Sequence, residues 1–215
     1  MMKKILFLTL VLSVFLFSGL SVNAGDFSGI ISFRKIDGND TTLYKFYIGE
    51  NRIRVEDVKD DGSLNGIMLI NLDNTSILAL SGSNKFYINV PISDKKPDPL
   101  ELEVEKTKNK KKVAGMDCTL WIVKNKLSGE KSEYWVNKRS YSFFNGMLKL
   151  LNRDELIARS WNQMEVKPDF FPMIGIEYSP SGEMVTKIEV LTIEEKKLPE
   201  SLFFVPEDYE LLERQ

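Results

Sequence analysis

The hydrophobic residues of this sequence alternate with polar ones along most of the chain, and this pattern restricts the fold to one rich in strands. In residues 27–34 the apolar Phe27, Ile31 and Phe33 alternate with polar neighbours, which is the period of a half-buried strand. Similar runs recur at 41–48, 52–56, 84–90, 116–123, 130–138, 173–178 and 183–193, separated by turn residues such as Asp37-Gly38-Asn39-Asp40. The sequence therefore predicts a sheet of many short strands.

One segment, residues 141–164, changes to a helical period. Phe144, Met147, Leu148 and Leu151 recur at helical spacing, and Ile157, Trp161 and Met164 continue the pattern after a polar break. Asn152 and Glu155 resemble a capping box in that break, with Asn in the role of Ser or Thr. We expect either two short helices or one kinked helix.

The runs at 66–72 and 75–80 are apolar on both faces, unlike the other expected strands. Strands of this kind lie where both faces of a sheet are covered. Because 141–164 is the amphipathic helical segment of the sequence, we interpret it as the cover of this sheet. We further interpret it as a mobile lid, with the break at Asn152 as the place where it parts.

The first residues have the pattern of a secretory signal peptide. Lys3 and Lys4 precede an apolar run at 5–20, and Val22-Asn23-Ala24 offers small residues for cleavage after Ala24. The alternative is an uncleaved membrane anchor, but the apolar run has about 16 residues against the ~20 that a spanning helix needs. We expect residues 1–24 to be removed and residues 25–215 to form a single periplasmic domain without a lipid anchor.

The chain has one cysteine and no histidine. Cys118 has no second cysteine for an internal disulfide, lies far from the cleavage site where a lipid would be attached, and lacks a histidine base or co-ligand. It sits in the alternating row Met116, Cys118, Leu120, Ile122, which favours a buried, small apolar residue. We therefore expect no enzymatic activity, no metal site and no cofactor.

Charge argues against nucleic acid as a partner. Without Lys3 and Lys4 the chain keeps 27 basic against 31 acidic residues, a net charge of −4. Residues 91–112 begin with Pro91, Pro97 and Pro99 and end in a run of lysines from 106 to 112. We interpret this region as an exposed connection with a charged edge strand, and a basic patch for anionic headgroups is the alternative.

Three motifs carry a family resemblance beyond the leader: the opening Phe27-Ser28-Gly29, the segment Val113-Ala114-Gly115-Met116-Asp117-Cys118, and the end of the chain from Leu198 to Tyr209. Together they resemble a bacterial exported family whose domain is of unknown function. More distantly, the order of strands, helix and hairpin is similar to the carrier and receptor superfamily of outer-membrane lipoproteins (Lol-type). The resemblance implies a mainly β fold with α (α+β): a strongly curved antiparallel sheet, or half-open barrel, covered by one or two amphipathic helices.

These observations lead to two functional hypotheses. The first is a periplasmic binding or carrier protein that holds an acyl chain or other apolar ligand between sheet and helix, in the traffic of outer-membrane lipid or lipoprotein; its partner would be a lipid or an acylated protein. The second is a non-enzymatic envelope protein with a filled core and a protein partner. The candidates for lining an apolar pocket are Phe33, Leu69, Met116, Leu120, Phe144, Met147, Leu148, Leu151 and Trp161.

Overall fold

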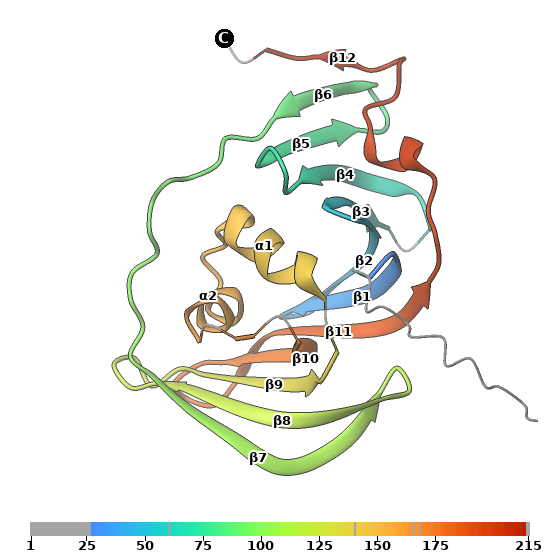
Figure 1. The fold of residues 1–215 in the computed structure, drawn as a ribbon. Coiled ribbons are helices and arrows are strands. Elements are labelled where there is room, and N and C mark those ends of the chain that lie inside the picture. The colour runs from blue at the N-terminus through green and yellow to red at the C-terminus, as the bar shows by residue number, and fades with distance from the viewer. Residues whose placement is uncertain (1–26, 60, 140, 165, 168, 214–215) are drawn as a thin grey trace, which may run out of the picture.

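The fold was obtained as a computed structural model, which describes residues 27–213 except 60, 140, 165 and 168. The expected signal peptide, residues 1–24, lies outside these described residues. One sheet of twelve strands, in the order β12-β6-β5-β4-β3-β2-β1-β11-β10-β9-β8-β7, curves around two helices (Figure 1). The prediction of a curved sheet covered by helices is therefore confirmed, and the sheet does not close into a barrel.

The first six strands form a meander, and the next five join it where the eleventh strand pairs with the first. The strands are β1 (Gly29–Asp37), β2 (Asp40–Gly49), β3 (Arg52–Val58), β4 (Leu64–Asn71), β5 (Ser76–Ser81), β6 (Phe86–Asn89), β7 (Leu102–Val113), β8 (Met116–Asn125), β9 (Lys131–Asn137), β10 (Phe171–Tyr178), β11 (Met184–Glu195) and β12 (Glu210–Leu211). Neighbouring strands are antiparallel, but the short β12 pairs with β6 in parallel. The charged edge strand expected after the prolines is β7.

The helical segment divides into α1 (Ser142–Leu151) and α2 (Leu156–Gln163). Asn152 ends α1 in the left-handed conformation, with φ 43° and ψ 50°, and its backbone N–H donates to the carbonyl of Leu148. The predicted capping box was wrong, because Glu155 is the residue that precedes α2 and its side chain does not cap that helix. The carboxylate of Glu177 accepts from the N–H of Ile157 in the first turn of α2, at 3.3 Å. The amide of Asn152 instead donates to the carbonyl of Lys95, 2.9 Å away.

Each face of the doubly apolar strands β4 and β5 has its own cover. On the inner face, Met68 and Ile70 belong to the main core together with Met147 of α1. On the outer face, Ile67, Leu69 and Leu80 form a second cluster under Val205 and Tyr209 of the C-terminal segment, residues 197–212. This segment includes a short 3-10 helix, η1 (Glu200–Phe203), and ends on the edge strand β6. The expected helical cover is thus correct for one face only.

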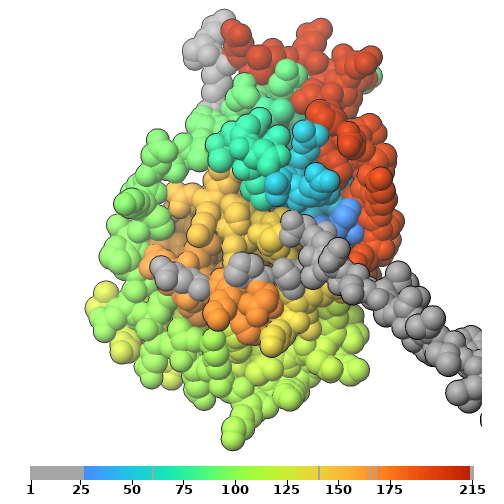
Figure 2. All heavy atoms as spheres, viewed as in Figure 1, coloured from blue at the N-terminus to red at the C-terminus, as the bar shows by residue number. Residues whose placement is uncertain are grey.

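The connecting segment, residues 90–101, runs outside both helices from β6 to β7 (Figure 1). Its backbone is held by side chains of the helical region. Arg159 and Gln163 of α2 donate to the carbonyl of Asp98 at 3.1 and 2.9 Å, and Gln163 accepts from the N–H of Leu100 at 2.7 Å. In the space-filling view the helices, yellow and orange, fill much of the opening between the upper and lower parts of the sheet (Figure 2).

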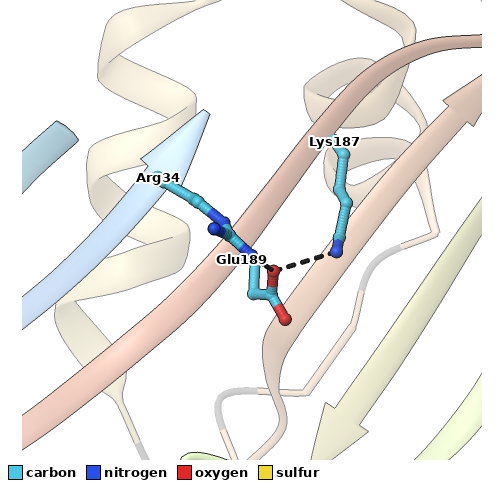
Figure 3. A network of polar contacts seen from close by, with 3 residues as sticks. All are labelled: Arg34, Lys187 and Glu189. Carbon is cyan, nitrogen blue, oxygen red and sulfur yellow. Dashed lines mark hydrogen bonds and ion pairs between the residues drawn. The ribbon is translucent and has the colours of Figure 1, made fainter. Parts of the chain in front are cut away.

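The face of the sheet turned away from the helices is polar at its centre. Arg34 of β1 and Lys187 of β11 both donate to the same oxygen of Glu189, each at 2.9 Å (Figure 3).

Cys118 is 2% exposed, so its prediction as a buried residue is confirmed. Within the described part of the chain, no helix has the length and apolar character required to cross a bilayer.

Candidate ligand cavity

A cavity of about 520 Å³ lies between the concave face of the sheet and the two helices. Its wall comes from strands β1 to β5 and β9 to β11, from α1 and α2, and from the loop between them. A volume of this size is within the range of small-molecule sites. The apolar wall comprises Ile31, Phe33, Phe46, Val55, Met68, Ala79, Phe144, Met147, Leu148, Leu151, Ile157, Ala158, Trp161, Phe171, Pro172, Ile188 and Val190. Ile67 and Leu80 also border the cavity, although they belong to the cluster on the outer face of the sheet.

Small residues on the strands keep this space open. Gly66 and Ala79 line the cavity on the neighbouring strands β4 and β5. A Cβ atom added at Gly66 would meet no atom within 4 Å, so the space beside it is empty. Gly175 on β10 has the opposite role, because a Cβ there would lie 2.5 Å from Cδ1 of Ile157. Its missing side chain lets α2 pack closely on the sheet.

The aromatic side chains of the wall pack against one another. Phe144 of α1 contacts Phe171 of β10 edge to face, with ring centroids 4.9 Å apart, and Phe33 contacts Phe46 in the same way at 4.5 Å. Such pairs add about 0.5–1.5 kcal/mol to the burial of their area. They therefore hold the wall in place around a space that side chains do not fill.

The charged residues of the wall gather with Tyr44 at one end, which we call the mouth and define as Lys35, Tyr44, Asp57, Arg153 and Glu155. The register places Tyr44 directly opposite Asp57, and Lys35 lies one strand away near the end of β1. Arg153 and Glu155 come from the loop between the helices. The cavity is thus apolar over most of its wall and polar at one end.

Ion pairs connect the two sides of the mouth. Nζ of Lys35 lies 2.7 Å from Asp37 and 3.8 Å from Glu155, so a strand residue and a loop residue share one ammonium group. Partial burial disfavours the charge of Lys35, but the hydrogen bond and charge of Asp37, together with Glu155, raise its pKa above the ordinary value. The ammonium group therefore stays charged at neutral pH.

A buried polar cluster fixes α2 on the sheet. The hydroxyl of Tyr134 on β9 donates to the carbonyl of Ile157 at 2.7 Å and lies 3.1 Å from the hydroxyl of Ser160. Burial raises the pKa of Tyr134, so the phenol keeps its proton. The two helices are also joined, because Nε1 of Trp161 donates to Oδ1 of Asn145 at 3.2 Å.

The structure brings six of the nine candidate residues to the cavity wall: Phe33, Phe144, Met147, Leu148, Leu151 and Trp161. Leu69 lies on the opposite face of β4, in the cluster under the C-terminal segment. Leu120 and Met116 of β8 also lie outside the wall. Since side chains alternate along a strand and Trp121 packs with Trp161, Leu120 points away from α2.

The mouth and the small residues of the wall were not predicted from the sequence. Gly66 has a signal in the sequence, because it is a glycine inside a strongly apolar strand, and such glycines mark sites of close approach or open space. The residues of the mouth have no local signal, since they come together from four separate segments. In the described residues no group of three His, Cys, Asp or Glu is arranged to hold a metal ion.

Comparison with known proteins identifies a family and a fold. The family "Domain of unknown function (DUF4412)" matches residues 27–209. No curated protein sequence matches the chain. An uncharacterized conserved protein from Thermus thermophilus has a similar structure, with a TM-score of 0.53, 11% identity, and coverage of 86% of this chain and 89% of that one.

Two further structures come from larger or more distant proteins. A chain from the complex of MucA and MucB of Pseudomonas aeruginosa has a TM-score of 0.50 at 11% identity, over 86% of this chain and 58% of that one. A domain described as an outer membrane lipoprotein-sorting protein, from Vibrio parahaemolyticus, has a TM-score of 0.36 at 14% identity, over 81% and 88%. At these identities the likenesses concern the fold alone, and the last score is too low to support an argument.

Proposed function

The chain belongs to the DUF4412 family, and we propose that it is a periplasmic binding or carrier protein that holds an acyl chain or similar apolar ligand between its sheet and its helices. The observation that carries this proposal is the cavity of about 520 Å³, whose wall is apolar except at one end. That distribution matches an amphiphile with its chain inside and its polar end at the mouth.

The energetics favour such a ligand. Each methylene that leaves water contributes about 0.8 kcal/mol, so affinity should rise with chain length until the chain fills the cavity. The methionines of the wall, Met68 and Met147, adapt to chains of different shape because their side chains repack easily. The role proposed is one of binding rather than catalysis, in the traffic of lipids or lipoproteins of the outer membrane.

The filled-core alternative is less well supported, because the space between helices and sheet is open. A protein partner is a second candidate, since the similar MucB structure comes from a complex with MucA. A ligand-binding cavity and a partner surface are compatible on one fold. The periplasmic location is part of the proposal and rests on the leader pattern at residues 1–24.

A cavity-blocking variant tests the proposal. Gly66→Trp places an indole in the open space beside β4, where an added side chain meets no atom within 4 Å at its Cβ. The matched control is Gly82→Trp, since Gly82 also has open space at its Cβ but lies in an exposed turn outside the cavity wall. Binding of a fluorescent fatty acid is measured by titration for both variants and for the unmodified protein.

We expect Gly66→Trp to abolish saturable binding and Gly82→Trp to preserve it, with the far-ultraviolet circular dichroism unchanged in both. Equal binding by all three proteins would overturn the cavity as the site. Native mass spectrometry of the protein purified from membranes provides a second measurement. It should detect co-purified lipid on the unmodified protein and on Gly82→Trp, and none on Gly66→Trp.

A further inference from the structure

The charges at the mouth differ in how far they are already neutralised. Lys35 is shared by Asp37 and Glu155, at 2.7 and 3.8 Å. Asp57 accepts a hydrogen bond from the amide of Asn65 at 2.9 Å. Among the residues that the structure describes, Arg153 has no carboxylate within ion-pair distance. Its guanidinium is therefore the positive charge of the mouth that has no counter-ion among these residues.

Arg153 lines the mouth together with two other hydrogen-bond donors, Tyr44 and Lys35. Burial and the charge of Asp57 raise the pKa of Tyr44, whereas the charges of Lys35 and Arg153 oppose that rise, which puts both cations within electrostatic reach of the phenol. Tyr44 stacks on Phe33 with ring centroids 5.2 Å apart, so the phenol ring is held against the apolar wall. A guanidinium, a phenol hydroxyl and an ammonium group thus surround the entrance to an apolar space.

We propose that the mouth selects amphiphiles with an anionic headgroup, a carboxylate or a phosphate, and that Arg153 is the residue that binds it. The planar guanidinium matches both groups because it donates two parallel hydrogen bonds to a pair of oxygens. The Tyr44 hydroxyl supplies a third donor beside the first carbons of the chain. This inference rests on the proposed function, since it assigns the polar end of the same ligand.

The two acidic residues of the mouth set a limit on this preference. Glu155 is already engaged with Lys35, and Asp57 remains as the group that repels an anion. Removing the charge of Asp57 should therefore strengthen the binding of an anionic headgroup, the opposite of removing the charge of Arg153. A merely structural role of either residue would not produce effects of opposite sign on affinity.

Four ligands of one chain length separate headgroup from chain: dodecanoate, dodecyl phosphate, dodecanol and dodecylammonium. Each is titrated into the unmodified protein below its micellar concentration by isothermal calorimetry. The variants are Arg153→Gln and Asp57→Asn. The matched control is Lys149→Gln, which also removes one exposed positive charge from the helical region but lies outside the cavity wall.

We expect both anionic ligands to bind about tenfold more tightly than dodecanol, since hydrogen bonds to charged groups contribute this much. Arg153→Gln should bring the affinity for the anionic ligands down to that for dodecanol and leave dodecanol binding unchanged. Asp57→Asn should increase the affinity for the anionic ligands, and Lys149→Gln should leave all affinities unchanged. Comparison of the two anions distinguishes a fatty acid from a phosphate lipid.

If dodecanol binds as tightly as the anions, or dodecylammonium binds best, the headgroup assignment is wrong while the acyl-binding function stands. If none of the four binds, the proposed function fails, and the headgroup assignment fails with it.

Discussion

The phenol of Tyr134 on β9 donates a 2.7 Å hydrogen bond to the backbone carbonyl of Ile157 in the first turn of α2. Tyr134 and Ser160 are each 1% exposed, so this contact lies inside an otherwise apolar interface. A buried hydrogen bond of this kind fixes one register of helix on sheet, because any other register leaves the same groups without partners. The helical cover is therefore attached most firmly at α2.

Tyr134→Phe tests that attachment. The substitution removes one hydroxyl and leaves the carbonyl of Ile157 with one partner fewer, so we expect the free energy of unfolding to fall by about 1–3 kcal/mol. Urea denaturation measures it. Tyr178→Phe is the control, because the Tyr178 hydroxyl makes a longer, 3.3 Å contact with Glu133 at a half-buried position. A loss for Tyr178→Phe as large as that for Tyr134→Phe would contradict the assignment.

Cys118 should be inert in the native protein. Burial raises the pKa of its thiol to about 11, and the thiolate is the reactive species. We expect alkylation between pH 7 and 9 to be slow in the native state and fast in urea. Cys118→Ala should cost about 1–2 kcal/mol of stability as a small cavity, without loss of acyl-probe binding. Rapid labelling of the native protein would show that the residue is accessible after all.

Hydrogen exchange tests the interpretation of residues 141–164 as a mobile lid. Because α2 is tied to β9 and to the connecting segment, we expect its amides to exchange slowly whether or not a ligand is bound. The loop 152–155 forms one side of the mouth and touches the sheet through the 3.8 Å contact of Glu155 with Lys35. A fatty acid should slow exchange in this loop and in α1. If α2 is protected by the ligand as strongly as α1, the whole segment opens as one unit.

The strands and the helical segment were predictable because each has a local signal. Alternation of apolar and polar residues marked the hairpin of β10 and β11, and helical spacing marked α1 and α2. The two-sided apolar character of β4 also showed correctly that both of its faces are covered. Local patterns of this kind depend on which side chains are buried, and burial is what periodicity records.

The side of the sheet to which a residue points was harder to predict. Leu69 and Met68 are adjacent and both apolar, so the sequence offers no sign of which one faces the helices. Leu120 and Trp121 present the same ambiguity on β8. The covers themselves come from distant parts of the chain, Val205 and Tyr209 on one face and α1 on the other. Only the long-range pairing decides which neighbour lines the cavity.

Paired substitutions on β4 separate its two faces. Leu69 is 6% exposed and lies under the C-terminal segment, so Leu69→Ala should lower the free energy of unfolding by about 2–5 kcal/mol, the usual effect of truncating a buried leucine. Met68 is half-buried and borders an existing space, so Met68→Ala removes fewer contacts within the protein and should cost roughly 1 kcal/mol.

For fatty-acid affinity the order of the two variants should be reversed: Met68→Ala should have the larger effect and Leu69→Ala the smaller. Met68 lines the cavity, and losing its side chain removes contacts with the ligand, so we expect binding to weaken on the order of fivefold. Leu69→Ala leaves the wall intact, and at a temperature where it remains folded it should bind as the unmodified protein does. Urea denaturation and probe titration together give both quantities for each variant. If Leu69→Ala weakened binding more than Met68→Ala, the ligand would lie under the C-terminal segment instead of under the helices, because that segment is the cover that Leu69 contacts.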